Sequence, residues 1–228
     1  MDSFSKKSVF LQSMNTMNMA EQTAKYLLEV KAVKLNNEHP FTWASGRKSP
    51  IYCDNRVTLS YPGIRSFIRQ HFVEIIKSQF VDVDVIAGVA TGGIAQGALV
   101  AQELNLPFVY VRSEAKSHGL TNQIEGEIHE GQSVVVIEDL VSTGKSSLIA
   151  VDALRAKGCD VKGMVAIFTY GLAVAQQNFD NAKVLLHTLT NYDTLIKVAA
   201  QEDYVSRTDL ESLAEWRLNP EKWSEDRS

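Results

Sequence analysis

The chain has 228 residues, of which 45% are hydrophobic and 22% are charged, which is enough for one domain with a substantial core. Its 23 Lys and Arg residues against 27 Asp and Glu residues give a formal net charge of -4. A chain without an overall basic field is not expected to bind nucleic acid. No apolar run approaches the ~20 residues that a membrane span requires, so we expect a soluble protein.

The two cysteines, Cys53 and Cys159, lie far apart in the sequence and lack the spacing of a metal site. This favours two reduced thiols and a cytoplasmic protein. Residues 1–19 mix Ser, Lys, Asn and Met without a continuous apolar stretch, so they are not expected to be a signal peptide. We interpret residues 1–19 as a flexible extension or an upstream start, and residues 20–228 as a single domain.

The first part of the chain divides into two predicted helices and an irregular segment. Apolar residues recur at helical spacing from Asn18 to about Leu35, which predicts a first helix. Residues 39–62 lose that period because three prolines and Gly46 interrupt it, so they are expected to form a small separate region. A second amphipathic helix is predicted at about Gly63–Gln79.

The rest of the chain alternates β-branched apolar runs with helical patterns. The predicted strands are Val83–Val89, Phe108–Arg112, Ser133–Ile137, Val161–Thr169 and Lys183–His187. The predicted helices are Gly93–Leu104, Gly144–Lys157, Gly171–Asn178 and, opened by a capping box of Thr208 and Glu211, about Asp209–Arg217. Strands without polar alternation are buried on both faces. We therefore predict an α/β fold with a central, mostly parallel sheet flanked by helices, and ligands at the carboxyl ends of its strands.

One predicted strand, Ser133–Ile137, leads into two acids, Glu138 and Asp139, and then into a small polar loop before a helix. The free N–H groups of a helix start suit a phosphate. Adjacent carboxylates would repel a phosphate and suit hydroxyl groups or a cation, so a phosphorylated sugar meets both needs. A P-loop would require Gly five positions before Gly144, where the chain has Asp139. The other alternative is a plain turn with exposed acids.

This segment resembles the phosphoribosyl pyrophosphate (PRPP) motif of the type I phosphoribosyltransferases. The resemblance implies that Glu138 and Asp139 hold the ribose hydroxyls. It also implies that the following loop cradles the 5-phosphate, through Leu140, Val141, Ser142, Thr143, Gly144, Lys145 and Ser146.

A second short loop, Thr91-Gly92-Gly93, follows the predicted strand Val83–Val89. Two glycines at such a point let backbone amides approach an anion closely. In the family that the PRPP motif resembles, this position is the pyrophosphate loop, which implies that Thr91, Gly92 and Gly93 bind the donor. A plain strand-to-helix connector is the alternative.

The polar segment between Arg112 and Ser133 is long enough to be a lid. It resembles the lid of the orotate phosphoribosyltransferases, which implies that Arg112, Lys116 and His118 bind PRPP and stabilise the departing pyrophosphate while water is excluded. In that family the loop commonly reaches into the neighbouring subunit's site, which implies a homodimer with a shared active site. The alternative is a set of polar residues in a solvated loop.

The string from Phe41 to Asp54 resembles the hood that covers the base in the same family. An aromatic ring can pack over a planar base, and a nearby cation favours an anionic substrate. The resemblance implies an orotate site formed by Lys48, Tyr52, Cys53, Ser142 and Tyr170. An exposed basic turn before an edge strand is the alternative.

The chain departs from the best-known members at three places. Ala44 and Gly92 stand where many carry Lys, and Tyr170 stands where others carry Arg. These departures concern how the orotate carboxylate and the pyrophosphate are neutralised.

Together these resemblances imply an enzyme that transfers phosphoribosyl from PRPP to orotate, giving orotidine 5'-monophosphate and pyrophosphate in de novo pyrimidine (UMP) biosynthesis. Lys116, His118 and Asp139 are its expected catalytic residues. The expected cofactor is Mg²⁺, chelated chiefly by the donor, with no metal site made by the protein alone. The alternatives are a purine or uracil phosphoribosyltransferase, or a non-catalytic nucleotide-sensing regulator on the same fold.

Overall fold

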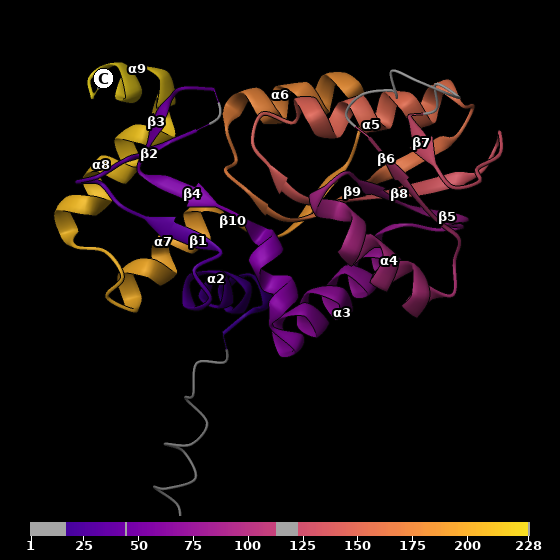
Figure 1. Cartoon of the computed structure of the whole chain (residues 1–228), viewed down its shortest axis with the longest axis horizontal. Helices are drawn as coiled ribbons and strands as arrows, with labels where there is room; N and C mark the ends of the chain where they lie inside the picture. The colour runs from indigo at the N-terminus through magenta and orange to yellow at the C-terminus, as the bar shows by residue number, and fades with distance from the viewer. Residues whose placement is uncertain (1–16, 44, 113–122, 228) are drawn as a thin grey trace, which may run out of the picture.

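A computed structural model describes residues 17–43, 45–112 and 123–227. Within these residues a six-stranded sheet has the order β10-β9-β8-β5-β6-β7 (Figure 1). Its strands are β5 (Val85–Val89), β6 (Phe108–Val111), β7 (Ile124–Glu125), β8 (Ser133–Val141), β9 (Asp160–Thr169) and β10 (Leu186–Asn191). Only the β6–β7 pair in this sheet is antiparallel. The predicted α/β fold with a mostly parallel sheet is confirmed.

Helices cover both faces of the sheet. One face carries α5 (Lys145–Ala156) and α6 (Ala173–Ala182), and the other carries α3 (Pro62–Gln79) and α4 (Gly92–Leu104) (Figure 1). Successive residues of the central strand β8 alternate between the two cores: Val134 and Val136 pack with α5, and Val135 packs with α3. All three valines are fully buried, which explains the unalternating apolar pattern of this strand.

The hood consists of two small antiparallel pairs. Strand β1 (Val33–Leu35) pairs with β4 (Ile51–Cys53), and β2 (Phe41–Thr42) pairs with β3 (Lys48–Ser49). A 3₁₀ helix, η2 (Asn55–Ser60), then leads back to the main sheet.

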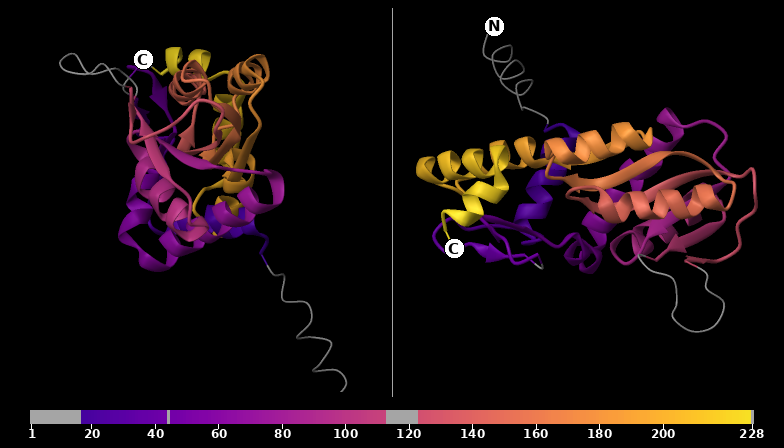
Figure 2. Two further views of the ribbon diagram at one scale, coloured as in Figure 1. Left: turned by 90° about the vertical axis from the view of Figure 1, so that its right-hand side faces the viewer. Right: turned by 90° about the horizontal axis from the view of Figure 1, so that it is seen from above.

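The C-terminal helices lie beside the hood at the same end of the molecule (Figures 1 and 2). They are α7 (Tyr192–Gln201), α8 (Arg207–Leu218) and α9 (Pro220–Glu225). The main-chain N–H of Lys48 donates a 2.8 Å hydrogen bond to the hydroxyl of Ser224, which ties β3 to α9. The hood and the C-terminal helices therefore pack on each other.

Two element boundaries near the first helix and the central strand were predicted wrongly. Helix α2 (Met19–Glu29) does not continue to Leu35, because Lys31 takes a left-handed conformation with φ 57° and the chain then enters β1. Apolar residues continue through this break, so periodicity alone did not reveal it. Strand β8 continues past Ile137 to Val141, so both acids of the motif belong to the strand rather than to the loop.

The predictions for the last third of the chain also need correction. The strand predicted at Lys183–His187 begins only at Leu186, because Lys183 ends α6 with φ 52°. Helix α7 was not predicted. Helix α8 begins at Arg207, and its capping box is formed by Ser206 and Asp209, not by Thr208 and Glu211. Both versions have the same spacing of a hydroxyl and an acid, so the sequence did not discriminate between them.

The described helices include none that is both long enough and apolar enough to cross a membrane.

Candidate active site

A polar cavity of about 400 Å³ lies at the carboxyl ends of β5 and β8. In the sheet, β6 pairs with one side of β5 and β8 pairs with the other side. The cavity therefore lies where the order of the strands reverses. The cavity is lined by Cys53, Asp54, Arg56, Val89, Ala90, Thr91, Gly92, Glu138, Asp139, Leu140, Ser142, Thr143, Gly144 and Ser146. The fold therefore brings the two predicted phosphate loops and the acid pair together.

Three residues predicted to bind PRPP lie at the margins of this arrangement. Gly93 lies one position further into α4 than the lining residues, and its main chain packs on β8. Val141 is fully buried in the core beneath α5. Lys145 is exposed and lines a neighbouring cavity instead.

The Asp139 carboxylate lies directly against the main chain of Gly92. A Cβ atom added at Gly92 would be 2.2 Å from Cγ of Asp139. At Gly93 it would be 2.2 Å from the main-chain oxygen of Ile137. The start of α4 thus fits against the end of β8 only because neither residue has a side chain. A side chain at position 92 would therefore require the Asp139 carboxylate to move.

The other acid of the pair, Glu138, is 5% exposed. Its Oε2 accepts a 2.9 Å hydrogen bond from the hydroxyl of Ser147 in α5, and its Oε1 accepts one of 2.9 Å from the N–H of Asp139. Burial, with the charge of Asp139 as a second cause, raises the pKa of the Glu138 carboxyl well above its usual range. Glu138 therefore hydrogen-bonds the end of β8 to the first turn of α5. Its contact with ribose stays a prediction.

Three residues after the hood enter the site and were not predicted. The amide of Asn55, which is 1% exposed, donates a 2.6 Å hydrogen bond to the main-chain oxygen of Asp139. Arg56 and Asp54 both line the cavity and form an ion pair with N–O distances of 2.7 and 2.9 Å. Three polar residues, Asp-Asn-Arg, directly after a short apolar strand are a weak sequence signal for site residues, and the predicted site did not include them.

The loop after β8 is suited to an anion. Gly144, with φ 79°, turns the chain into α5, and a Cβ atom there would be 2.7 Å from Cε2 of Phe179. No side chain caps the first turn of α5, so its N–H groups are available to a ligand. Outside the loop, the amide of Asn178 donates to the main-chain oxygen of Thr143 and holds the loop to α6.

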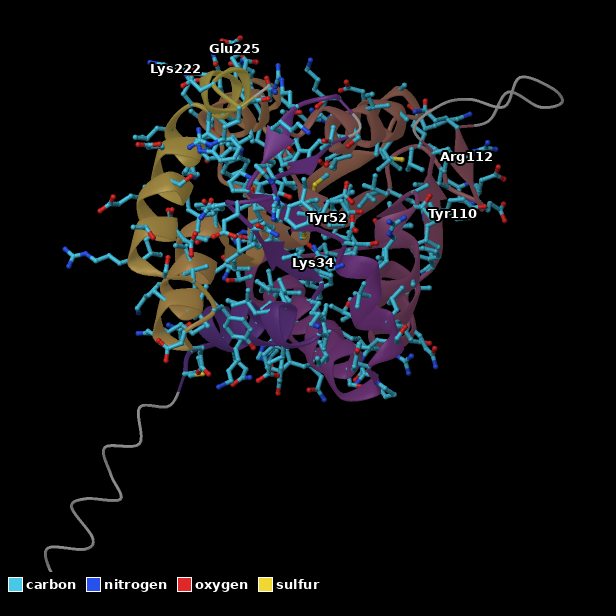
Figure 3. All side chains as sticks on the ribbon, turned by 60° about the vertical axis from the view of Figure 1, so that its left-hand side comes forward. Lys34, Tyr52, Tyr110, Arg112, Lys222 and Glu225 are labelled. Atoms are coloured by element: carbon cyan, nitrogen blue, oxygen red, sulfur yellow. The ribbon has the colours of Figure 1, made fainter. Side chains whose placement is uncertain are left out.

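A smaller cavity of about 170 Å³ adjoins the first and shares Cys53, Leu140 and Ser142 with it. The remaining lining residues are Trp43, Tyr52 and Tyr170. Four of the five residues predicted for orotate are thus brought together, and Tyr52 is seen between the C-terminal helices and the Arg112 end of β6 in the view of Figure 3. Lys48, the fifth, lines a different cavity.

Aromatic rings form half of the lining of this smaller cavity. The rings of Trp43 and Tyr170 are 5.3 Å apart, with an angle of 34° between their planes. Tyr170 is 3% exposed, and burial raises the pKa of its hydroxyl well above its usual range. Trp43 was quoted in the hood string but not predicted as a site residue. The shape and lining suit a planar ring.

The lid prediction concerns residues that mostly lie outside the described chain, including Lys116 and His118. Arg112 follows β6, and its Nη1 lies 3.5 Å from Oε1 of Glu125 in β7. Arg112 is not among the residues that line either cavity, and Figure 3 shows it near Tyr110 at the end of β6.

In the part of the chain that the structure describes, no group of three or more His, Cys, Asp or Glu side chains could hold a metal ion. Asp139 and the ion-paired Asp54 are the partly exposed carboxylates of the larger polar cavity. A hard cation such as Mg²⁺ keeps several ligands from water or phosphate oxygens. The residues present therefore fit an ion that arrives with a diphosphate.

Comparisons with known proteins agree with this geometry. Residues 60–198 match the phosphoribosyl transferase domain family, so the fold and site are those of a phosphoribosyltransferase. An orotate phosphoribosyltransferase of Bacteroides fragilis is 57% identical over 206 residues, covering 90% of this chain and 97% of that protein. One from Listeria monocytogenes is 58% identical over 207 residues, covering 91% and 99%. The chain belongs to the orotate phosphoribosyltransferase family.

Solved structures with the same fold include two informative cases. The orotate phosphoribosyltransferase of Aeropyrum pernix is 29% identical with a TM-score of 0.69, covering 80% of this chain and 99% of that one. The UMP synthase of Leishmania donovani is 23% identical with a TM-score of 0.74, covering 88% of this chain. The present chain spans only 42% of that protein, so this likeness concerns the fold alone.

Proposed function

We propose that the protein transfers the phosphoribosyl group of PRPP to orotate and releases pyrophosphate, forming orotidine 5'-monophosphate for pyrimidine synthesis. The observation that carries this proposal is the junction of two cavities at Ser142: a polar one at the two phosphate loops and a flat aromatic one under the hood. A sugar phosphate in the first and a planar base in the second would meet where the new bond forms. The family relationship supports the same reaction.

In this reaction the bond between C1 of the ribose and the pyrophosphate oxygen breaks, and its electron pair leaves with the pyrophosphate. N1 of orotate bonds to C1 and loses its proton, which the released pyrophosphate can take up. Asp139 is proposed to hold ribose hydroxyls, and its position in the lining of the cavity, beside Gly92, supports this role. The backbone N–H groups at the start of α5 are proposed to hold the 5-phosphate, because no side chain of the N-cap residue occupies them. This fixed geometry favours reaction by orientation.

We further propose that Mg²⁺ accompanies the donor and that the carboxylate of Asp139 would help to hold it. Bound there, the ion would neutralise charge on the diphosphate. Negative charge builds on the leaving group in the transition state, so cations of the lid, Lys116 and His118, are proposed to stabilise it. The two cysteines are free thiols, which supports a reducing cytoplasm as the place of action.

Pyrophosphate release tests the proposed reaction directly. The protein would be incubated with PRPP, Mg²⁺ and one of orotate, uracil, hypoxanthine or adenine. We expect release with orotate and none above background with the other three bases. Comparable rates with adenine or hypoxanthine would reject orotate as the substrate and leave the fold intact, and no release with any base would favour a nucleotide sensor.

We also propose a homodimer whose lid completes the partner's site, as in the family. Two inactive variants, Lys116→Ala and Asp139→Asn, would be mixed under conditions in which subunits exchange. A shared site predicts recovery of about one quarter of the wild-type activity per site for random pairing. No recovery in a mixture with demonstrated exchange would show that each lid closes over its own subunit.

A further inference from the structure

The polar cavity at the ends of β5 and β8 contains few positive charges for the donor that it is proposed to bind. Asp54, Glu138 and Asp139 contribute three carboxyl groups to its lining. Arg56 is the single cationic residue among the described residues that line it. The loop at the start of α4, residues 91–93, adds no cation. PRPP brings a phosphate and a diphosphate, so a resident cation is needed to offset the repulsion between like charges.

Arg56 lies on η2, the short helix that leads from the hood back to the main sheet. Helix η2 packs against α4 and against β8. The amide of the neighbouring residue, Asn55, holds it to the strand by the hydrogen bond to the main-chain oxygen of Asp139. The hydrogen bonds to Asp54 and, with a smaller effect, the charge of Asp139 raise the pKa of Arg56 above its ordinary value. The guanidinium therefore lies within electrostatic reach of both acids.

The guanidinium of Arg56 still has hydrogen-bond donors available for a ligand. Its Nε and Nη2 donate hydrogen bonds of 2.7 and 2.9 Å to the two carboxylate oxygens of Asp54. Its Nη1 has no hydrogen-bond partner among the described residues. The side chain of Arg56 is 57% exposed, and an exposed ion pair adds little to stability. The contact with Asp54 can therefore be exchanged for a contact with a more highly charged ligand.

We propose that Arg56 binds the diphosphate of PRPP and that it exchanges Asp54 for this group when the donor enters the cavity. The planar guanidinium can bind phosphate oxygens through the same parallel hydrogen bonds that it makes to a carboxylate. We assign the diphosphate rather than the 5-phosphate, because the 5-phosphate is proposed to lie at the start of α5, whereas η2 packs on α4 and β8. This inference rests on the proposed function, because it takes PRPP as the donor.

Calorimetric titration with PRPP, pyrophosphate and ribose 5-phosphate, each in the presence of Mg²⁺, tests the assignment. In Arg56→Gln the Kd for PRPP and the Kd for pyrophosphate should rise about ten- to hundredfold, as for loss of a hydrogen bond to a charged group. The Kd for ribose 5-phosphate should stay within about twofold of the wild-type value, because this ligand lacks the diphosphate.

Two further variants sharpen the comparison. Arg207→Gln is the matched control, because Arg207 is exposed at the start of α8 and does not line the cavity. It loses the same charge and should match the wild type with all three ligands. Asp54→Asn can keep the bond that Asp54 accepts from the N–H of Arg56, but it releases the guanidinium. Its Kd for pyrophosphate should therefore fall, by up to about fivefold, the range for an exposed ion pair.

Arg56→Lys keeps the charge and loses the planar fork, so its Kd for pyrophosphate should lie between those of the wild type and Arg56→Gln. It also carries the test if the Gln variant fails to fold, as judged by thermal unfolding. Unchanged affinity for PRPP and pyrophosphate in a folded Arg56 variant, or equal losses for pyrophosphate and ribose 5-phosphate, would overturn the assignment. Failure of the wild type to bind PRPP would instead reject the proposed function.

Discussion

The side-chain amide of Asn55 is held 2.6 Å from the main-chain oxygen of Asp139, so the helix that follows the hood is bonded to the end of the central strand. Its own Oδ1 lies 3.2 Å from Sγ of Cys53, which lines both the donor cavity and the base pocket. Asn55 therefore links the position of Asp139 to the position of the hood.

Replacement of Asn55 by Ala removes this link and leaves a buried carbonyl oxygen without its donor. We expect a loss of about 1–3 kcal/mol in the free energy of unfolding. The KM for PRPP should rise as well, because Asp139 is less firmly placed. Urea denaturation and initial rates measure the two effects. Unchanged stability and KM would mean that water replaces the amide without consequence.

The two glycines at the start of α4 are expected to respond differently to Ala. The added methyl at Gly92 meets the carboxylate of Asp139, a side chain that can move, so Gly92→Ala should displace the proposed donor-binding carboxylate. At Gly93 the methyl meets the main-chain oxygen of Ile137, which cannot move without the strand. We expect Gly92→Ala mainly to lower kcat/KM for PRPP, and Gly93→Ala to lower the Tm by several degrees, as overpacking costs about 1–3 kcal/mol.

The reverse order of effects, with Gly92→Ala less stable and fully active, would contradict the close approach of Asp139 to α4. Each glycine variant serves as the control for the other, because the two positions are adjacent and the added atom is the same.

Substitution of Asp139 by Asn preserves the shape of the side chain and removes its charge. We expect kcat/KM for PRPP to fall about ten- to hundredfold, the range for a hydrogen bond to a charged group. Asp152→Asn, at an exposed position of α5, is the matched control and should behave as the wild type. If Asp139→Asn retained full activity at low PRPP concentration, its carboxylate would have no part in binding the donor.

Glu138 gives a prediction for the pH dependence of stability. Burial raises its pKa in the folded protein, so the folded state retains a proton that the unfolded chain releases near its ordinary pKa of 4.5. This group therefore contributes most to stability below that pH, and the contribution falls as pH rises toward the folded-state pKa. Glu138→Gln stays neutral and should become more stable relative to the wild type over that interval.

Thermal unfolding of both proteins from pH 4.5 upward measures the difference in Tm. A difference that stays constant with pH would show that the Glu138 carboxyl ionises equally readily in the folded and unfolded states. A glutamine amide can accept from the N–H of Asp139 through its oxygen and donate to the hydroxyl of Ser147 through its NH2 group, so both contacts survive and the comparison tests the charge.

The sequence by itself determined the parts of this protein that are contiguous in the chain. The buried valines of β8, the acids at its end and the loop into α5 follow one another directly, so apolar patterning and helix-end chemistry sufficed to predict a strand and a phosphate-binding turn. The alternation of such units predicted the sheet. The predicted boundaries of helices and strands were wrong where a residue in the left-handed conformation, such as Lys31 or Lys183, ended a helix inside a continuing apolar pattern.

Only the tertiary structure decided which distant residues are brought together around the candidate site. Asn55 bonds to a residue 84 positions away, and Arg217 reaches Gly171 across 46 positions. Their positions are set by packing between the hood and α8. In this packing the ring centroids of Trp43 in the hood and Trp216 in α8 are 5.8 Å apart. Periodicity and spacing report only local geometry, whereas such contacts depend on how far-separated apolar faces bury one another. A single sequence therefore indicates the PRPP motif. The packing of the hood against the C-terminal helices determines which other residues surround that motif.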